Sequence, residues 1–378
     1  MNISELDKNF KVETISGLDF RFYDVTQAPF SLEGLAWKDG DTPYHRLPSR
    51  ITAQALADSM IKLMPETAEN ALTWGKTLLE LSKHTSGACV RFRTNSKSIA
   101  LRATLRDSCD MSHMPRMGSA GFDLYQAPDS QVLLHTGSVA IAPNQLNGDV
   151  MQVVQANEDN SMKNCLLNLP LYGGVVKLEI GLMPNAIVEP PHPHKVPHPI
   201  LFYGSSITQG GCASRPGNQY SSFLCRAVDA EQINQGYSGN AKGQPLMAET
   251  IAELKLSCLV MDYDHNAPSP EHLRKTHENF FRIIREKHPD LPVIFLTRPA
   301  FWVNREDTIL REQIIRETWL HAIKRGDTKV WFLPARDMIG KVEYDACTVD
   351  RCHPNDIGFY RMYRSVLPIL KEALGLEE

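Results

Sequence analysis

A proline-rich segment divides this sequence into two parts whose residue patterns differ. In the segment 189–199, five of the eleven residues are prolines. Proline fixes φ and lacks an N–H group, so this segment cannot lie inside a helix or a central strand. We therefore expect a stiff, extended linker at 189–199 that joins an N-terminal domain, 1–188, to a C-terminal domain, 200–378. Each part is long enough to bury a hydrophobic core of its own.

The N-terminal part alternates between apolar and polar residues with the period of a β-strand. Within 89–105, Val90 and Phe92 are expected on one face and Arg91 on the other. One helix is expected around Ile51–Met64. Turn-forming residues separate three further β-rich runs, which are Gln131–Ala140, Asp149–Val154 and Val175–Leu182. The pattern predicts an antiparallel β-sandwich.

The C-terminal part repeats a strand followed by a helix. Helix-length amphipathic segments, such as 272–285 and 310–324, lie between short apolar runs. Those runs are Ile200–Tyr203, Leu259–Tyr263, Val293–Leu296 and Val330–Leu333. This alternation predicts an α/β domain whose parallel sheet is covered by helices on both faces. Polar motifs follow several of the runs directly, which is where such sheets place their sites.

Charge and hydropathy exclude several classes of partner. The net charge of −4 gives no electrostatic reason to bind nucleic acid or an acidic membrane. No stretch reaches the roughly 18 apolar residues that a membrane span needs. The N-terminus, 1–10, is polar and lacks the apolar core of a signal peptide. As written, the protein is expected in the cytoplasm, whereas a removed leader would make it periplasmic or secreted. The sequence does not indicate an oligomeric state.

The sequence contains no recognisable metal or cofactor motif. The eight cysteines form no Cys-x-x-Cys pair, and we expect them to be free thiols. The linker histidines His192, His194 and His198 are expected to be solvated along the domain seam. Their proline-rich spacing gives them no common face and no nearby acidic partner. We therefore expect neither a bound metal nor a cofactor.

Three residues have the chemistry of a serine hydrolase. Ser206 lies just after the apolar run 200–203, and Asp350 and His353 lie three residues apart near the C-terminus. A serine hydroxyl needs a base to take its proton, and that base needs a third group to fix its tautomer. Cys352 is an alternative nucleophile and His265 an alternative base. The glycine-rich surroundings of Ser206 favour the serine.

Four motifs in this order resemble those of the SGNH (GDSL-type) hydrolases. They are Gly-x-Ser-x-Thr-x-Gly at 204–210, Asn234–Gly239, Asp262–Asn266, and Asp350-x-x-His353. Gly121-Phe-Asp-Leu-Tyr125 also resembles the signature of the β-domain (GxDLY-type) that precedes the hydrolase domain in one branch. The resemblance implies a three-layer α/β/α domain in which Ser206, His353 and Asp350 form a catalytic triad. It also implies an oxyanion hole built from the Ser206 N–H, the Gly239 N–H and the side chain of Asn266.

The sequence departs from the family pattern in two motifs. Ser205 precedes the nucleophile where aspartate is usual, and Asp264-His-Asn-Ala267 replaces the commoner Gly-x-Asn-Asp. Neither change removes a group that takes part in the reaction. They do make lipase-like and thioesterase-like relatives poorer guides to the substrate.

Residues near the predicted site suggest a polar substrate. Arg298 ends a predicted strand, and an arginine there can bind a carboxylate or a sugar hydroxyl. Trp302 can stack on a sugar ring or lie in the core, and His265 is a further substrate candidate. The loops 213–219, 240–244 and 305–307 are polar, and we expect Asn218 and Gln219 at the rim.

We therefore expect a serine esterase that removes short acyl groups, most simply O-acetyl groups, from a carbohydrate. A lipase or thioesterase is the main alternative, and it would require an apolar acyl channel. A catalytically inert glycan-binding protein is a third hypothesis. The intact set of catalytic residue types argues against that last one.

Overall fold

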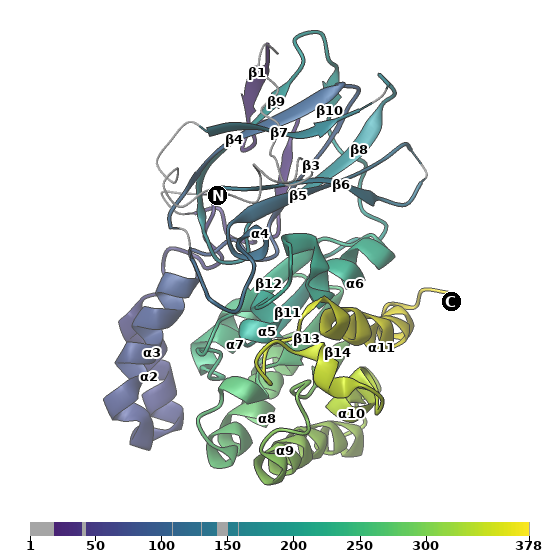
Figure 1. The fold of residues 1–378 in the computed structure, drawn as a ribbon. Helices are drawn as coiled ribbons and strands as arrows, with labels where there is room; N and C mark the ends of the chain where they lie inside the picture. The colour runs from purple at the N-terminus through teal and green to yellow at the C-terminus, as the bar shows by residue number, and fades with distance from the viewer. Residues whose placement is uncertain are drawn as a thin grey trace.

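The computed structural model describes residues 19–39, 43–107, 109–129, 131–141, 150–157 and 159–377. The expectation about the N-terminal residues 1–10 lies outside these ranges. The β-rich part lies above an α/β part in Figure 1.

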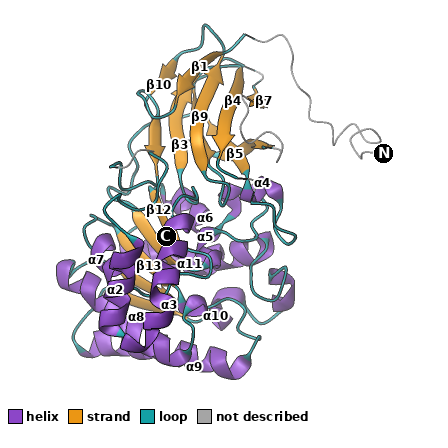
Figure 2. Cartoon of the chain, turned by 90° about the vertical axis from the view of Figure 1, so that its left-hand side faces the viewer, coloured by secondary structure: helices purple, strands orange, loops and turns teal. Residues whose placement is uncertain are grey.

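Two antiparallel sheets form the β-rich part (Figure 2). The first has the order β1 (Arg21–Asp24), β9 (Val175–Leu182), β4 (Ser98–Leu105) and β7 (Val150–Ala156). The second has the order β10 (Val188–Glu189), β3 (Cys89–Thr94), β8 (Lys163–Asn168), β5 (Gly121–Ala127) and β6 (Leu134–Ala140), with β2 (Ser31–Glu33) also paired to β3. Phe92, Leu101 and Ile180, from both sheets, share one buried cluster. The predicted β-sandwich is confirmed.

Strand β3 shows why the period-two pattern identified this domain. Val90 and Phe92 are fully buried between the sheets. Arg91 and Arg93, on the opposite face, form ion pairs with Glu33 and Glu189 at 3.1 and 2.7 Å. Alternating residues therefore meet the core and the polar surface in turn, as a pleated strand requires.

Five parallel strands form the sheet of the α/β part. Their order is β12 (Gln232–Gly236), β11 (Ile200–Gly204), β13 (Cys258–Asp262), β14 (Val293–Leu296) and β15 (Val330–Leu333). Its helices are α5 (Ser206–Gln209), α6 (Tyr220–Val228), α7 (Pro245–Ile251), α8 (Pro270–Lys287), α9 (Arg305–Lys324), α10 (Ala335–Ile339) and α11 (Asp356–Leu374). The first of these strands in the sequence is β11. The next strand, β12, lies on one side of β11, and β13, β14 and β15 lie on the other side. Such a switch point is where open α/β sheets place their ligands.

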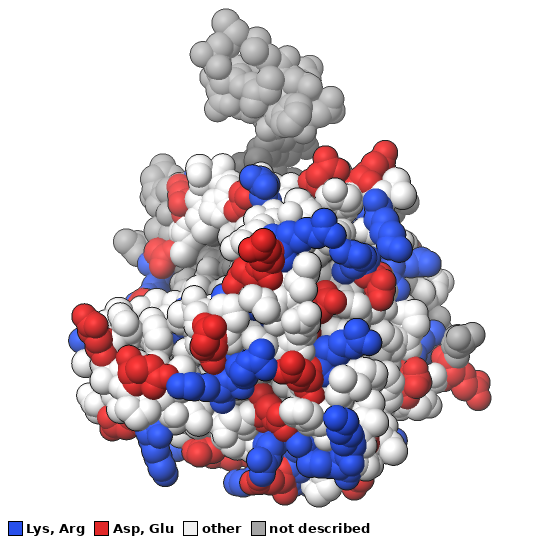
Figure 3. All heavy atoms as spheres, turned by 90° about the horizontal axis from the view of Figure 1, so that it is seen from below, with Lys and Arg blue, Asp and Glu red and all other residues white. Residues whose placement is uncertain are grey.

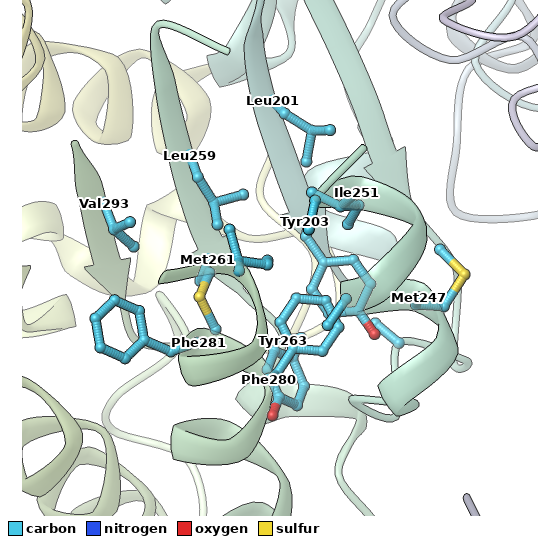
Figure 4. Close-up of a cluster of buried hydrophobic side chains, with 14 of the residues drawn as sticks. Leu201, Tyr203, Met247, Ile251, Leu259, Met261, Tyr263, Phe280, Phe281 and Val293 are labelled. Atoms are coloured by element: carbon cyan, nitrogen blue, oxygen red, sulfur yellow. The ribbon is translucent and has the colours of Figure 1, made fainter. Parts of the chain in front are cut away.

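Both faces of the parallel sheet are buried, which explains the continuous apolar runs in the sequence. Tyr203 and Met261 pack with Phe280 of α8 on one face (Figure 4). Phe202 and Val260, the neighbouring residues on the same strands, pack on the opposite face against α6 and α11. Helices thus cover the sheet on two sides, and the predicted three-layer α/β/α fold is confirmed.

A helical hairpin in the N-terminal part packs on the α/β domain. Helix α2 (Ala53–Leu63) confirms the expected helix, whereas α3 (Ala68–Leu81) was not predicted. The hairpin lies beside α7 in Figure 1, and Leu56 and Leu78 share the buried cluster of Leu201. Residues before the linker thus complete the core of the C-terminal domain. The boundaries 1–188, 189–199 and 200–378 stay predictions.

The proline-rich linker is anchored on both sides rather than solvated throughout. The ring of His194 donates or accepts hydrogen bonds at 2.9 Å to Glu33 of the β-domain and to Asp229 of the α/β domain. Arg91 donates to the carbonyl oxygen of His192 at 2.8 Å. The linker therefore connects the two domains through side chains as well as through the backbone.

The surface carries charges of both signs. On the face shown in Figure 3, basic and acidic side chains are interspersed, in keeping with the small net charge. Within the described ranges, no helix combines the length and the apolarity needed to cross a membrane.

Candidate active site

Ser206 begins a single helical turn directly after the first parallel strand. Ser205 caps this turn, because its hydroxyl accepts a hydrogen bond from the N–H of Ile207 at 3.1 Å. Gly210 ends the turn with φ +96°, a conformation that favours glycine. A Cβ on Gly204 would lie 2.1 Å from the hydroxyl oxygen of Thr208, so this close turn also needs glycine. The sequence thereby presents the Ser206 side chain at the end of β11.

Ser206, His353 and Asp350 form one chain of hydrogen bonds. Oγ of Ser206 lies 2.9 Å from Nε2 of His353, and Nδ1 of His353 lies 2.7 Å from Oδ2 of Asp350. This geometry lets the imidazole accept the hydroxyl proton at Nε2 while the carboxylate holds a proton on Nδ1. The structure therefore brings together the three residues that the sequence nominated for the triad.

The Asp350 carboxylate also shapes the loop that carries the histidine. Its Oδ1 accepts hydrogen bonds from the N–H groups of Cys352 and His353 at 3.0 and 2.7 Å. Burial alone would raise the pKa of Asp350, but hydrogen bonds from His353 outweigh it and lower that pKa. Asn355 caps α11 by accepting from the N–H of Gly358 at 3.1 Å. His353 thus lies between Asp350, which is held by backbone hydrogen bonds, and the capped N-terminus of α11.

Three hydrogen-bond donors come from the ends of adjacent strands. In the sheet register, Gly204 pairs with Gly236 of β12 and with Asp262 of β13. The loops after these two strands carry Gly239 and Asn266, whose role with Ser206 in an oxyanion hole stays a prediction. Oδ1 of Asn266 accepts from the N–H of Ala241 at 3.3 Å, so its Nδ2 is the end that remains to donate. In the described ranges, the N–H groups of Ser206 and Gly239 donate no hydrogen bond.

Buried polar side chains fix the loop that carries Gly239. Arg46 donates to the carbonyl oxygens of Asn234 and Gly236 at 3.0 and 2.8 Å, and also to those of Leu81 and His84. Gln209 of the nucleophile turn accepts from the N–H of Ser238 at 2.9 Å. Both side chains are fully buried. Arg46 therefore connects the end of β12 to α3, and Gln209 connects the loop after β12 to the turn of Ser206.

A second arginine fixes the loop that carries Asn266. Arg311 of α9 donates to the carbonyl oxygens of Asp264 and Ala267 at 2.6 and 2.9 Å. Lys242 donates to the carbonyl oxygen of Asn266 at 2.7 Å. These bonds leave the loop around Asn266 little freedom to move away from Ser206.

The β-domain signature holds the loop that follows the nucleophile turn. The buried carboxylate of Asp123 accepts from the N–H of Gly217 at 2.9 Å and from Arg215 at 2.7 Å. Arg215 also contacts the hydroxyl of Tyr125. This loop is therefore an interface between the domains.

The expected polar rim at Asn218 and Gln219 is wrong. Both side chains are buried, with exposed fractions of 8% and 1%. Asn218 donates to Asp356 of α11 at 2.8 Å, and Gln219 donates to Ser222 at 3.0 Å. The polar composition of 213–219 reflects internal hydrogen bonding, which a sequence pattern does not distinguish from solvation.

His265 is paired with Cys352 rather than with Ser206. Its Nε2 lies 2.7 Å from Sγ of Cys352, and its buried Nδ1 has no partner within the described residues. Burial lowers the pKa of His265 to about 4, so the ring is neutral. Burial and the Asp350 charge raise the pKa of Cys352 to about 11, opposite to an activated cysteine.

Arg298 is buried and Trp302 is half-buried, so neither side chain is fully exposed at the edge of the site. The guanidinium of Arg298 donates to Asp307 at 2.8 Å, and its N–H donates to Asp264 at 3.2 Å. The half-buried ring of Trp302 packs against Phe301 and Tyr344, with ring centroids 5.3 and 4.8 Å apart. Roles for Arg298, Trp302 and His265 in substrate binding stay predictions.

Two family models match the sequence, and together they cover most of it. Residues 197–371 match the "GDSL-like Lipase/Acylhydrolase family". Residues 51–188 match the "N-terminus of Esterase_SGNH_hydro-type" domain, whose model is named for the GxDLY signature. Residues 197–371 therefore belong to the GDSL-like hydrolases. No curated protein sequence matches this GDSL-like hydrolase.

Solved structures share the architecture of this GDSL-like hydrolase over nearly the whole chain. A protein from Bacteroides ovatus, solved as a GDSL-like lipase, is 28% identical and has a TM-score of 0.78, covering 95% of this chain and 99% of that one. A salicylyl-acyltransferase from a tetracycline biosynthetic pathway is 19% identical, with a TM-score of 0.68 and coverages of 94% and 98%. An acetyl xylan esterase from the rumen bacterium Butyrivibrio proteoclasticus is 11% identical, with a TM-score of 0.58 and coverages of 95% and 100%. The last two show a common fold alone.

Sequence reasoning missed several residues that position the site of this GDSL-like hydrolase. Arg46 lies in an irregular segment, and its partners are up to 190 residues away along the chain. Arg311 lies on a helix whose pattern alone suggests an exposed charge. Gln209, inside the nucleophile motif, was the one residue with a local signal, since it directly precedes the glycines of the turn.

Proposed function

We propose that this GDSL-like hydrolase is a serine esterase that removes short acyl groups, most simply O-acetyl groups, from a carbohydrate. The observation that carries the proposal is the continuous hydrogen-bonded chain from Ser206 through His353 to Asp350. Ser206 is the nucleophile, His353 the general base and Asp350 the group that orients the base.

In the first half of the reaction, Nε2 of His353 takes the proton of Ser206 as Oγ attacks the ester carbonyl carbon. The carbonyl oxygen becomes an oxyanion. The N–H groups of Ser206 and Gly239 and the Nδ2 of Asn266 stabilise that charge. His353 then gives its proton to the departing sugar oxygen, and the acyl group stays on Ser206 as an ester.

In the second half, water replaces the sugar alcohol. His353 takes a proton from water, which attacks the acyl carbon and forms a second oxyanion in the same hole. Collapse of this intermediate releases the carboxylic acid and returns the proton to Ser206. Asp350 stays ionised and keeps Nδ1 of His353 protonated throughout the cycle.

One unpaired polar atom near the base supports a polar alcohol group in the substrate. The buried Nδ1 of His265 has no hydrogen-bond partner within the described residues, so it is left to bind a hydroxyl group. The fold shared with an acetyl xylan esterase agrees with a carbohydrate ester. A lipase or thioesterase would gain about 0.8 kcal/mol per buried CH₂ of its acyl chain and would favour long chains.

The test is acyl release by purified protein from p-nitrophenyl esters of two to eight carbons and from a panel of acetylated saccharides. We expect the highest kcat/KM for acetate and acetate release from at least one saccharide. Ser206→Ala should lose at least about 10⁴-fold in kcat. Cys352→Ser, next to the base, is the matched control and should stay active.

Three outcomes would contradict the proposal. Efficiency that climbs steadily from acetate to octanoate indicates an acyl channel and a lipase or thioesterase. An inactive wild type that still binds a glycan indicates an inert binding protein. Full activity in the Ser206→Ala protein removes the serine mechanism.

A further inference from the structure

A histidine and a cysteine with soft metal-ligand character lie beside the proposed base. His113, Cys212 and His353 each offer a ligand atom, and these three atoms all lie within 4.8 Å of one another. The three residues come from distant segments: the β-domain loop before α4 (Arg116–Ser119), the nucleophile loop and the loop of the base. The rings of His113 and His353 have centroids 5.5 Å apart.

The backbone at Cys212 is strained in a way that the nearby glycines are not. Cys212 has φ +95°, in the left-handed region that residues with a Cβ rarely adopt. The side chain is buried, with an exposed fraction of 3%. Strain of this kind persists only where the surroundings hold it, and it concentrates at functional sites. The thiol is therefore kept at a defined place next to the base.

Nε2 is the nitrogen of His353 that is left to bind a metal in this cluster. Nδ1 is occupied by Asp350 at 2.7 Å. A Cβ on Gly211 would lie 3.3 Å from Cδ2 of His353, the ring carbon bonded to Nε2. The Cδ2–Nε2 side of the ring thus lies next to Gly211, and Nε2 itself lies 2.9 Å from Oγ of Ser206.

We propose that His113, Cys212 and His353 bind a thiophilic divalent ion such as Zn²⁺, with a fourth position left for water. Bond lengths of about 2.3 Å to sulfur and 2.0–2.1 Å to nitrogen place tetrahedral ligand atoms roughly 3.3–3.6 Å apart. The three atoms, which lie within 4.8 Å of one another, approach by up to about 1.5 Å to reach that spacing. His113 is exposed, so its side chain is free to make the adjustment.

Binding of this ion blocks the proposed base. The Nε2 lone pair of His353 can accept the proton of Ser206 or coordinate the metal, but it cannot do both. The ion is therefore a reversible inhibitor of the esterase. This consequence rests on the proposed function, whereas the metal site itself does not. One thiolate and two imidazoles select Zn²⁺ and Co²⁺ over Mg²⁺ and Ca²⁺, which prefer oxygen ligands.

The binding test uses the Ser206→Ala protein, full length, titrated with Co²⁺ under reducing conditions. We expect a thiolate-to-cobalt charge-transfer band that added Zn²⁺ abolishes. Cys212→Ser should lose the band, and His113→Gln should weaken binding at least about tenfold. Cys352→Ser is the matched control and should keep the band. Cys352 belongs to a second cluster with Asp350 and His353, so this variant shows which of the two cysteines binds the ion.

The activity test follows ester hydrolysis by the wild type. Zn²⁺ should inhibit, EDTA should restore the rate, and Mg²⁺ and Ca²⁺ should have no effect. His113→Gln, an exposed substitution, should raise the half-inhibiting Zn²⁺ concentration at least about tenfold. Absence of the cobalt band, or its loss in Cys352→Ser instead of Cys212→Ser, overturns the site. A protein with the band but no esterase activity keeps the site and disproves the function.

Discussion

The carboxylate of Asp123 in the β-domain accepts a hydrogen bond at 2.9 Å from the backbone N–H of Gly217 in the hydrolase domain. The same carboxylate binds Arg215 at 2.7 Å and is completely buried. Residues 213–219 follow the turn of Ser206 closely, so this bond connects the β-domain to the loop that follows Ser206. The signature residue of the β-domain thus acts on the neighbouring domain.

Asp123→Asn should destabilise the protein by about 1–3 kcal/mol, because it weakens buried hydrogen bonds and removes the charge that faces Arg215. We also expect kcat to fall, because the loop 213–219, which follows Ser206, loses a hydrogen bond that holds it in place. Urea unfolding and ester hydrolysis measure the two effects. Asp129→Asn is the matched control. Its ion pair with Arg93 is half-exposed and screened by solvent, so this substitution should change the stability much less. Equal effects of the two substitutions would contradict the role of Asp123.

Arg46→Met should cost about 3 kcal/mol or more, since it leaves several buried carbonyl oxygens without a donor. It should also reduce turnover, because two of these carbonyls belong to the segment that leads to Gly239. Arg50→Met is the control in the same segment, with an exposed ion pair to Glu253. The difference in urea midpoint between the variants checks the prediction. An Arg46→Met protein as stable as Arg50→Met would refute it.

Asn266→Ala should lower kcat about 100- to 1000-fold with little change in KM, because its Nδ2 is proposed to act in the transition state alone. Steady-state kinetics on p-nitrophenyl acetate measure both constants. Asn240→Ala, in the neighbouring loop, provides a control with the same loss of an amide. A large rise in KM with an unchanged kcat would assign Asn266 to substrate binding instead.

The linker histidine His194 should make stability depend on pH. Burial alone would lower the pKa of His194, but hydrogen bonds to Asp229 and Glu33 raise it to about 8. A folded-state pKa above the unfolded value of about 6.5 stabilises the protein fully below pH 6.5, and this contribution disappears as pH rises past 8. Its size is at most about 2 kcal/mol.

His194→Gln measures this contribution. The difference in free energy of unfolding between wild type and variant should shrink from pH 6 to pH 8.5. His192→Gln, whose ring is more exposed and lies 3.3 Å from Asp129, is the control and should show a smaller difference. Glu33 also pairs with Arg91, so that charge stays compensated in the variant. A difference that does not change with pH would contradict the prediction.

The strands and the catalytic motifs could be predicted from the sequence because their signals are local. Tyr203 and Phe202 lie in one apolar run because both faces of β11 are buried, and Ser206 follows within three residues. Asp350 and His353 are close in the sequence, so their pairing has a short-range pattern. The predicted contents of the two halves follow from the same periods of two and of 3.6 residues.

The remaining features depend on contacts between distant segments. Arg46, Asp123 and Arg311 look like ordinary charged residues, and only tertiary contacts give them buried partners. Asn218 failed as a rim residue for the same reason, since Asp356 of α11 covers it. The cluster of His113, Cys212 and His353 spans 240 positions, so no spacing rule identifies it.

The helical hairpin α2–α3 makes the two halves one cooperative unit. Leu56 and Leu78 complete the hydrophobic cluster beneath the parallel sheet, and Arg46 bridges the end of α3 and β12. A fragment that begins at residue 200 would expose that apolar surface to water and lose the arginine. The hydrolase half is therefore not a transferable module, and recombination or truncation at the linker would separate a core from part of its own packing.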